Sequence, residues 1–392
     1  MTWLPRVAGL LRLRAPGPAG QQEGERHATW LELFFDLVFA LALEAVTARL
    51  GGPSPTLARA AVAIALFLVV QWAWATQTFY DTRFDPDDWP HRILVFTATA
   101  GAGGIAIGAH HPPGGMLLPA GYLVVRGALL LMYLRVLVTS RSERSLTTVY
   151  LAGFSVGWCL WLVSLAAPVP ARPILWAVAL VIELSTPLWG HRWLERHPVD
   201  PTHLPERIGQ FTIILLGVTL TNLIDALTAA HPPAAVVGAA LVAFVIPICI
   251  WWVYTTFLTT RLAVPRLDTG VSYAFLHAPL GIGILFLGWA LGQVLLQVAE
   301  EKDRLPGPLR VGFAASLVIF TLAGLSLQWF SLGRVPRVRL GIAAVGIVPV
   351  VLTTAMTADP MTTLAVAAGS MVAYALFLAP QLRHVGARVG SL

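Results

Sequence analysis

The chain alternates between long apolar stretches and short polar turns. Stretches of about 20 mostly apolar residues, each long enough to cross a bilayer, recur along most of its length. Proline, glycine and charged residues separate them. This pattern predicts an all-α, polytopic transmembrane bundle of about twelve spans, which we expect to begin near Thr29, Leu57, Ile93, Gly114, Thr147, Pro173, Arg207, Ala234, Ser272, Leu309, Val338 and Pro360.

Composition supports a membrane protein and argues against a soluble domain. Hydrophobic residues make up 57% of the 392 residues and charged residues only 12%, about half of the roughly 25% typical of soluble domains. The net charge of +6 comes from basic residues spread over short loops. Such a distribution fits the positive-inside rule better than a nucleic-acid-binding patch. We therefore expect the lipid bilayer, and no nucleic acid, as a partner, with both termini in the cytoplasm.

The two halves of the chain resemble each other. Glu32 and Asp36 open the first span, and Glu206 and Gln210 open the seventh with the same spacing. An even number of spans in each half would make the repeats parallel. We expect a cytoplasmic basic tail at 1–28, six-helix repeats at 29–200 and 201–382, and a cytoplasmic tail at 383–392.

The first span carries the most informative charges, Glu32 and Asp36. They lie one helical turn apart and share a helix face, and a charge at bilayer depth costs about 2.5 to 3.5 kcal/mol on insertion scales. One interpretation is that they handle protons, cations or a polar solute. The alternative is structural: Glu32 interacts with the helix dipole and a neighbouring arginine satisfies Asp36.

A second acidic group follows the second span. Asp85, Asp87 and Asp88 lie between Arg83 and Arg92. Their Asp-x-Asp-Asp pattern has the form of the general-acid motif of class II terpene cyclases. The alternative is an ion-paired loop in which Asp87 or Asp88 caps the next helix.

Other polar residues in or beside the apolar spans complete the candidate set. Glu183 lies near the middle of the sixth span and needs either a proton or a partner. The start of the seventh span extends a polar stripe inward, and the ninth span places a tyrosine and a histidine one turn apart. No metal-ligand spacing accompanies them, so we expect neither a metal nor a cofactor. The candidates for a substrate or ion pathway are Glu32, Asp36, Arg83, Arg92, Glu183, His203, Glu206, Arg207, Gln210, Tyr273 and His277.

Four ordered motifs carry a resemblance to a known family. They are Trp30–Ala40, Tyr80–Arg92, His203–Gly217 and Tyr273–Pro279. Together they are similar to motifs of the bacterial low-temperature-requirement A family. The resemblance implies a multi-pass protein of the bacterial inner membrane, and the family is named for a growth phenotype in the cold rather than for a reaction.

The chain departs from that family at Val218, where an acidic residue is usual, and at Ile208 and Gln210. We expect a transporter or permeation pathway that uses intramembrane carboxylates. The alternative is an intramembrane enzyme that acts on a lipid or isoprenoid through acid-initiated chemistry at Asp85, Asp87 and Asp88. A third possibility is a structural membrane component whose polar motifs serve helix association.

Overall fold

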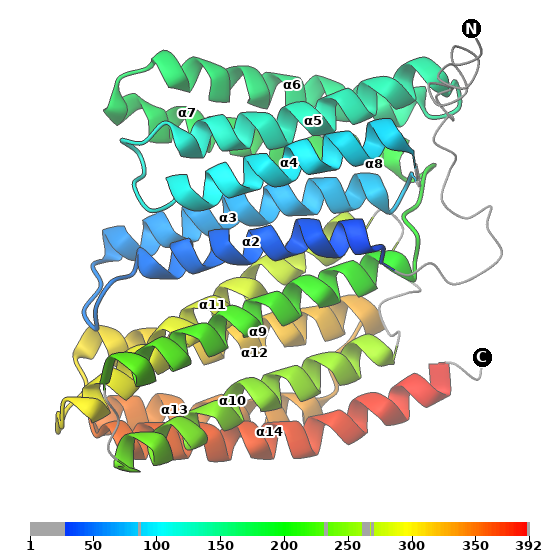
Figure 1. Cartoon of the computed structure of the whole chain (residues 1–392). Coiled ribbons are helices and arrows are strands. Elements are labelled where there is room, and N and C mark those ends of the chain that lie inside the picture. Colours follow the sequence, from blue (N-terminus) through cyan, green and yellow to red (C-terminus); the bar gives the residue numbers. More distant parts are fainter. Residues whose placement is uncertain (1–27, 85–87, 231–233, 261–266, 268–269, 390–392) are drawn as a thin grey trace, which may run out of the picture. The chain divides into compact units, whose positions relative to one another are not determined.

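The computed structural model describes residues 28–84, 88–230, 234–260, 267 and 270–389. This part of the chain is built from α-helices and contains one 3-10 turn, and its sequence of elements is visible in Figure 1. The elements are α2 (Trp30–Ala48), α3 (Leu57–Asp81), α4 (Trp89–Gly108), α5 (Leu117–Thr139), α6 (Arg144–Ala166), η1 (Val169–Ala171), α7 (Arg172–Trp189), α8 (His191–Leu194), α9 (His203–Ala230), α10 (Ala234–Thr259), α11 (Val271–Ala299), α12 (Gly307–Leu332), α13 (Arg337–Met356) and α14 (Pro360–Val389).

The long helices confirm the predicted all-α, multi-span fold. Each expected span start lies within four residues of the start of a helix of 18 or more residues. Ten helices in the described part of the chain are long and apolar enough to cross a membrane. Of the long helices, α2 and α4 are outside these ten. In α2, three acidic residues interrupt the apolar sequence: Glu32, Asp36 and Glu44.

The chain divides into two compact units. As far as they are described, residues 28–45, 68–207 and 267–271 form the first unit. Within it, α4 packs on α5, α5 on α6, and α6 on α7, as Figure 1 shows. The contact between α4 and α5 depends on glycine, because a Cβ atom added to Gly121 would lie 2.5 Å from the carbonyl oxygen of Gly101.

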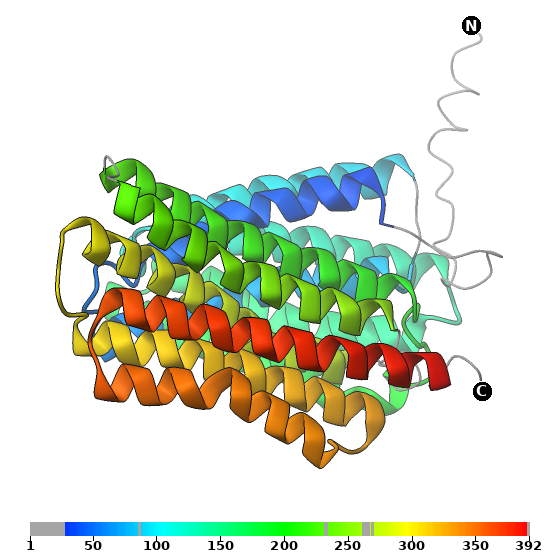
Figure 2. The ribbon, with the colours of Figure 1, turned by 90° about the horizontal axis from the view of Figure 1, so that it is seen from below.

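The second unit contains residues 46–67, 208–266 and 272–392, again as far as they are described. Its helix α14 lies beside both α10 and α13, and α13 in turn packs on α12. Figure 2 shows α14 in red along α10. The α12 helix ends at Gly333, whose φ of 71° places it in the left-handed region that favours glycine. The two six-helix repeats stay a prediction.

Candidate functional site

Asp36 lies at the centre of a buried ion pair in the first unit. Its two carboxylate oxygens accept hydrogen bonds from Arg207, Nη1 to Oδ2 at 2.6 Å and Nη2 to Oδ1 at 2.8 Å. Trp74 Nε1 donates a third bond to Oδ1 at 2.7 Å. Asp36 is 1% exposed and Arg207 is fully buried. Because both oxygens are held by donors, Asp36 orients Arg207 and Trp74 within the apolar core.

Glu32 lies one turn before Asp36 and faces a histidine. Its Oε1 lies 3.4 Å from His203 Nε2 and 3.9 Å from Arg207 Nε. Its Oε2 accepts a 2.7 Å hydrogen bond from the Thr29 amide, and the Thr29 hydroxyl accepts one from the Glu32 amide. This reciprocal pair is a capping box, which begins α2 and fixes the carboxylate of Glu32. Glu32 therefore caps the start of α2 and also places a carboxylate oxygen near His203 and Arg207.

A second cap positions His203. Asp200 Oδ1 accepts hydrogen bonds from the amides of Thr202 at 2.8 Å and His203 at 2.9 Å. Burial disfavours the ionised form of Asp200, but these amide bonds and the Thr202 hydroxyl outweigh it and lower the pKa of the Asp200 carboxyl group. The charged cap fixes the start of α9, and with it the side chain that meets Glu32.

Of the remaining predicted residues at the start of α9, Glu206 belongs to the first unit and Gln210 to the second. Glu206 is half-buried, and its Oε1 accepts a 3.4 Å hydrogen bond from the Ala28 amide. Gln210 is also half-buried and belongs to the part of α9 in the second unit. We name the group formed by Glu32, Asp36, His203 and Arg207 the α2–α9 cluster.

The acidic segment after α3 has a different character. Asp85 and Asp87 lie outside the described residues. Asp88 is the N-cap of α4: its Oδ1 accepts a bond from the His91 amide at 3.1 Å, and Arg135 binds both carboxylate oxygens. This confirms the expectation that Asp87 or Asp88 caps this helix. Burial opposes ionisation of Asp88, but the bonds from Arg135 and the His91 amide outweigh it and lower the pKa of its carboxyl group. A general acid must hold a proton, so this environment does not favour Asp88 in acid-initiated chemistry.

The two arginines that flank the acidic segment differ in burial. Arg83 is 3% exposed and donates to the carbonyl oxygens of His197 at 3.2 Å and Phe79 at 3.1 Å. Arg92 is exposed on α4. Arg83 thus ties the end of α3 to the segment that follows α8.

Glu183 has the partner that its depth in the sixth span requires. Its Oε2 accepts bonds of 2.5 Å from Tyr122 and 2.5 Å from Arg126 Nη2. Arg126 also donates to the Thr76 hydroxyl at 2.6 Å. These side chains are buried and come from α3, α5 and α7 of the first unit. Arg126 was not among the predicted site residues, although it is a charge near the middle of an otherwise apolar stretch of α5.

His277 and Tyr273 belong to the second unit. His277 Nδ1 lies 2.7 Å from the carbonyl oxygen of Tyr273, and Nε2 lies 3.2 Å from the Tyr254 hydroxyl. A carbonyl only accepts, so Nδ1 carries a proton, and in the neutral imidazole Nε2 then accepts from Tyr254. His277 is 4% exposed. Both ring nitrogens are therefore engaged, which fits an interhelical tie between α10 and α11.

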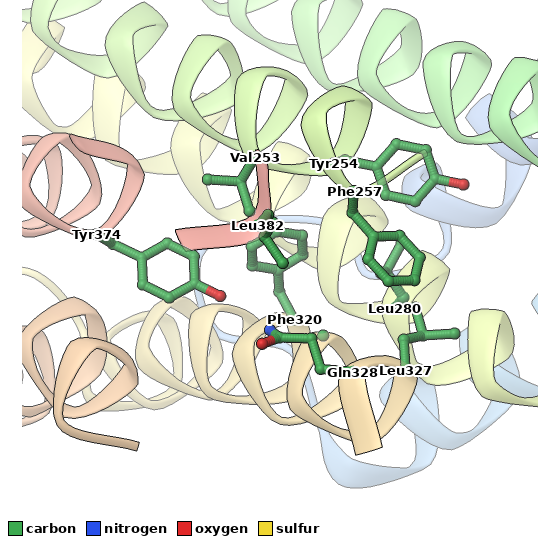
Figure 3. A pocket seen from close by; sticks show the side chains of 10 residues that line it. Val253, Tyr254, Phe257, Leu280, Phe320, Leu327, Gln328, Tyr374 and Leu382 are labelled. Atoms are coloured by element: carbon green, nitrogen blue, oxygen red, sulfur yellow. The ribbon is translucent and has the colours of Figure 1, made fainter. Parts of the chain in front are cut away.

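A small apolar cavity lies in the second unit between α10, α11, α12 and α14. Figure 3 shows Gln328 and Tyr374 turning their polar ends toward each other within it. Gln328 Oε1 accepts a 3.1 Å hydrogen bond from the buried Arg339. The cavity of about 30 Å³ holds a group about the size of one or two waters.

In the described ranges, no group of three or more His, Cys, Asp or Glu side chains is arranged to hold a metal ion. In the α2–α9 cluster, Glu32 faces His203 and Arg207, and Asp36 faces Arg207. The chemistry that this arrangement supports is proton exchange between a carboxylate and an imidazole.

Comparison with known proteins agrees with the motifs. The sequence model of the bacterial low temperature requirement A protein (LtrA) matches residues 27–377. An uncharacterized protein of Rhizobium meliloti (strain 1021), RA0937, is 26% identical over 308 residues, which cover 70% of this chain and 75% of that protein. The matched region contains α2 through most of α14 and the whole α2–α9 cluster. This multi-pass membrane protein therefore belongs to the bacterial low temperature requirement A family.

Proposed function

We propose that the protein is a proton-coupled transporter or permeation pathway in which the α2–α9 cluster carries the exchangeable proton. The observation that supports this is the charge balance of the cluster. Two ionised carboxylates and one arginine leave one negative charge, which is cancelled when His203 is protonated or when one carboxyl group is. Burying a net charge in an apolar core is costly. The cluster is therefore suited to binding one proton.

The contacts of the cluster support placing that proton on the side that holds Glu32 and His203. Asp36 accepts three hydrogen bonds from Arg207 and Trp74, and protonating it would weaken all three. Glu32 Oε1 lies 3.4 Å from His203 Nε2, so a small approach of the two side chains would bring these atoms to proton-transfer distance. Asp36 is then the fixed anchor, and the exchangeable proton is shared by Glu32 and His203.

Arg207 offers a way to couple that proton to a conformational change. It lies between two carboxylates one helical turn apart, at 2.6 Å from Asp36 and 3.9 Å from Glu32. Neutralising Glu32 removes one of the two attractions that hold the start of α9 against α2. Asp81 also acts on Arg207 through its charge, and Gln77 and His91 hold that carboxylate at 3.0 and 3.7 Å. Titratable contacts therefore link the start of α2 with the start of α9, and the end of α3 with the start of α4.

Proton movement in proteoliposomes tests the proposal. The protein is reconstituted with a pH-sensitive dye in the lumen, together with the small-molecule fraction of the cells that make it, because the transported solute is unknown. We expect an imposed pH gradient to dissipate faster than in empty liposomes, and Glu32→Gln and His203→Gln to abolish the difference. Glu44→Gln makes the same chemical change at an exposed position of the same helix and should leave the rate unchanged.

Two results of this experiment would contradict the proposal. Dissipation at the rate of empty liposomes with wild-type protein contradicts a proton-coupled pathway. Dissipation that survives Glu32→Gln and His203→Gln in folded protein places the proton elsewhere and overturns the assignment.

A further inference from the structure

The first unit carries a surface groove that is lined by residues outside the α2–α9 cluster. The first turns of α6 form one wall through Arg144, Ser145 and Thr148, and Trp189 and Trp193 form the other. Its volume of about 420 Å³ lies within the range of small-molecule sites. The indoles are open to the surroundings, with 48% of Trp189 and 37% of Trp193 exposed.

The groove is basic, and the carboxylates nearest to it in the sequence are paired with histidines. Arg192 lies over the ring of Trp193, 5.8 Å from its centroid. Glu143 pairs with His197 at 2.7 Å, and Glu195 pairs with His191 at 3.1 Å. No carboxylate in the described part of the chain lies within 4.0 Å of Arg144 or Arg192. The rim therefore presents positive charge that a bound anion would neutralise.

The position of the groove identifies the kind of anion. Both α6 and α7 are helices suited to crossing a membrane. Arg144 is the first residue of α6 and Trp189 the last of α7, so the groove lies where the spans end. Tryptophan and arginine at such ends occupy the headgroup level of the bilayer. Below the arginine, Val149 and Ala152 continue the groove along α6 with apolar surface.

We propose that this groove binds one anionic phospholipid. Its phosphate lies at Arg144, where the Ser145 and Thr148 hydroxyls donate hydrogen bonds, and Arg192 adds a second positive charge at the rim. An acyl chain follows the apolar surface of Val149 and Ala152 beside the two indoles. The charge complementarity selects a lipid with net negative charge over a zwitterionic one.

Tryptophan quenching by brominated lipids measures this preference directly. Full-length protein is reconstituted into phosphatidylcholine vesicles that contain brominated phosphatidylglycerol or, in the matched sample, brominated phosphatidylcholine. We expect stronger quenching by the anionic lipid. That excess should disappear in Trp189→Phe/Trp193→Phe, which removes the two reporting indoles. For Arg144→Gln and for Arg192→Gln, half of the maximal excess quenching should require about fivefold more phosphatidylglycerol than for wild type.

Arg337→Gln is the matched control. Arg337 is exposed and is the first residue of α13, as Arg144 is of α6, but it lies outside the groove. The control should keep the full excess. Equal quenching by the two lipids, or an excess that persists in Arg144→Gln/Arg192→Gln, overturns the proposal. Loss of the excess on adding inorganic phosphate would identify a free-anion site and also overturn it.

Discussion

Arg207 holds both carboxylate oxygens of Asp36 with hydrogen bonds of 2.6 and 2.8 Å, although 171 positions separate the two residues in the chain. This contact ties the start of α9 to α2 within the first unit. Removing one partner leaves the other charge buried without compensation.

We therefore expect Asp36→Asn and Arg207→Gln each to destabilise the protein by about 3 to 5 kcal/mol, the range for breaking buried pairs. The double variant should lose much less than the sum, because neither charge is then left alone. Unfolding in mild detergent, followed by circular dichroism against denaturant, gives the three free energies. Strict additivity would show that the two side chains do not stabilise each other.

Span positions were predictable because membrane burial is a local property of about 20 residues. The largest offsets lie at α4 and α9, which begin four residues before the expected Ile93 and Arg207. At both places the helix includes polar residues, such as His91 and His203. Hydropathy assigns such residues to loops, whereas backbone hydrogen bonding continues the helix through them.

The members of the α2–α9 cluster were predictable one by one, but their pairing was not. Each charge in an apolar span signals itself by its insertion cost, which singled out Glu32, Asp36 and Glu183. Which cation neutralises which acid depends on contacts between distant segments, and no local pattern encodes those. Arg126 is also a charge inside an apolar span, so its insertion cost could have singled it out as it did Glu183. A buried acid in one span requires a donor from another, and Arg126 is that donor.

Gly157 leaves the space that Glu183 fills. A Cβ atom at Gly157 on α6 would collide with the Glu183 carboxylate on α7. Gly157→Ala should therefore displace the ion pair with Arg126 and cost about 1 to 3 kcal/mol, as for overpacked cores.

Gly103→Ala provides the comparison, because nothing lies within 4 Å of the added Cβ atom at that helical position. It should be neutral or slightly stabilising. The melting temperatures of the two variants in detergent, each compared with wild type, measure this difference. A Gly157→Ala protein as stable as Gly103→Ala would mean that the space beside Glu183 is not filled.

Asp88 makes a pH-dependent contribution to stability. Because the pKa of Asp88 is lowered in the folded protein, its ionised form is stabilising above the unfolded pKa of about 3.9. This contribution disappears as pH falls through the lower, folded value. Asp88→Asn keeps a capping side chain but removes the charge that binds Arg135.

The variant should therefore be less stable than wild type at pH 7. The difference should shrink below about pH 4, where Asp88 of the unfolded chain takes up a proton, and disappear below the lower pKa of folded Asp88. Denaturant unfolding of both proteins across this pH range measures the difference in their free energies of unfolding. The contributions of the other acidic residues are the same in both proteins and therefore cancel. A difference that stays constant down to pH 3 would assign the effect of the substitution to something other than ionisation.

His277 should be a neutral imidazole with its proton on Nδ1. The carbonyl oxygen of Tyr273, 2.7 Å from Nδ1, can only accept, and the Tyr254 hydroxyl donates to Nε2 at 3.2 Å. Solid-state NMR of ¹⁵N-histidine-labelled protein distinguishes the two tautomers by the shifts of the ring nitrogens. Tyr254→Phe removes the donor to Nε2, so that nitrogen should shift toward the value of an unbonded acceptor while Nδ1 keeps its proton. Tyr273→Phe retains the backbone carbonyl and should leave the Nδ1 signal in place. A proton on Nε2 in the wild-type protein would reverse the direction of the Tyr254 hydrogen bond and contradict this assignment.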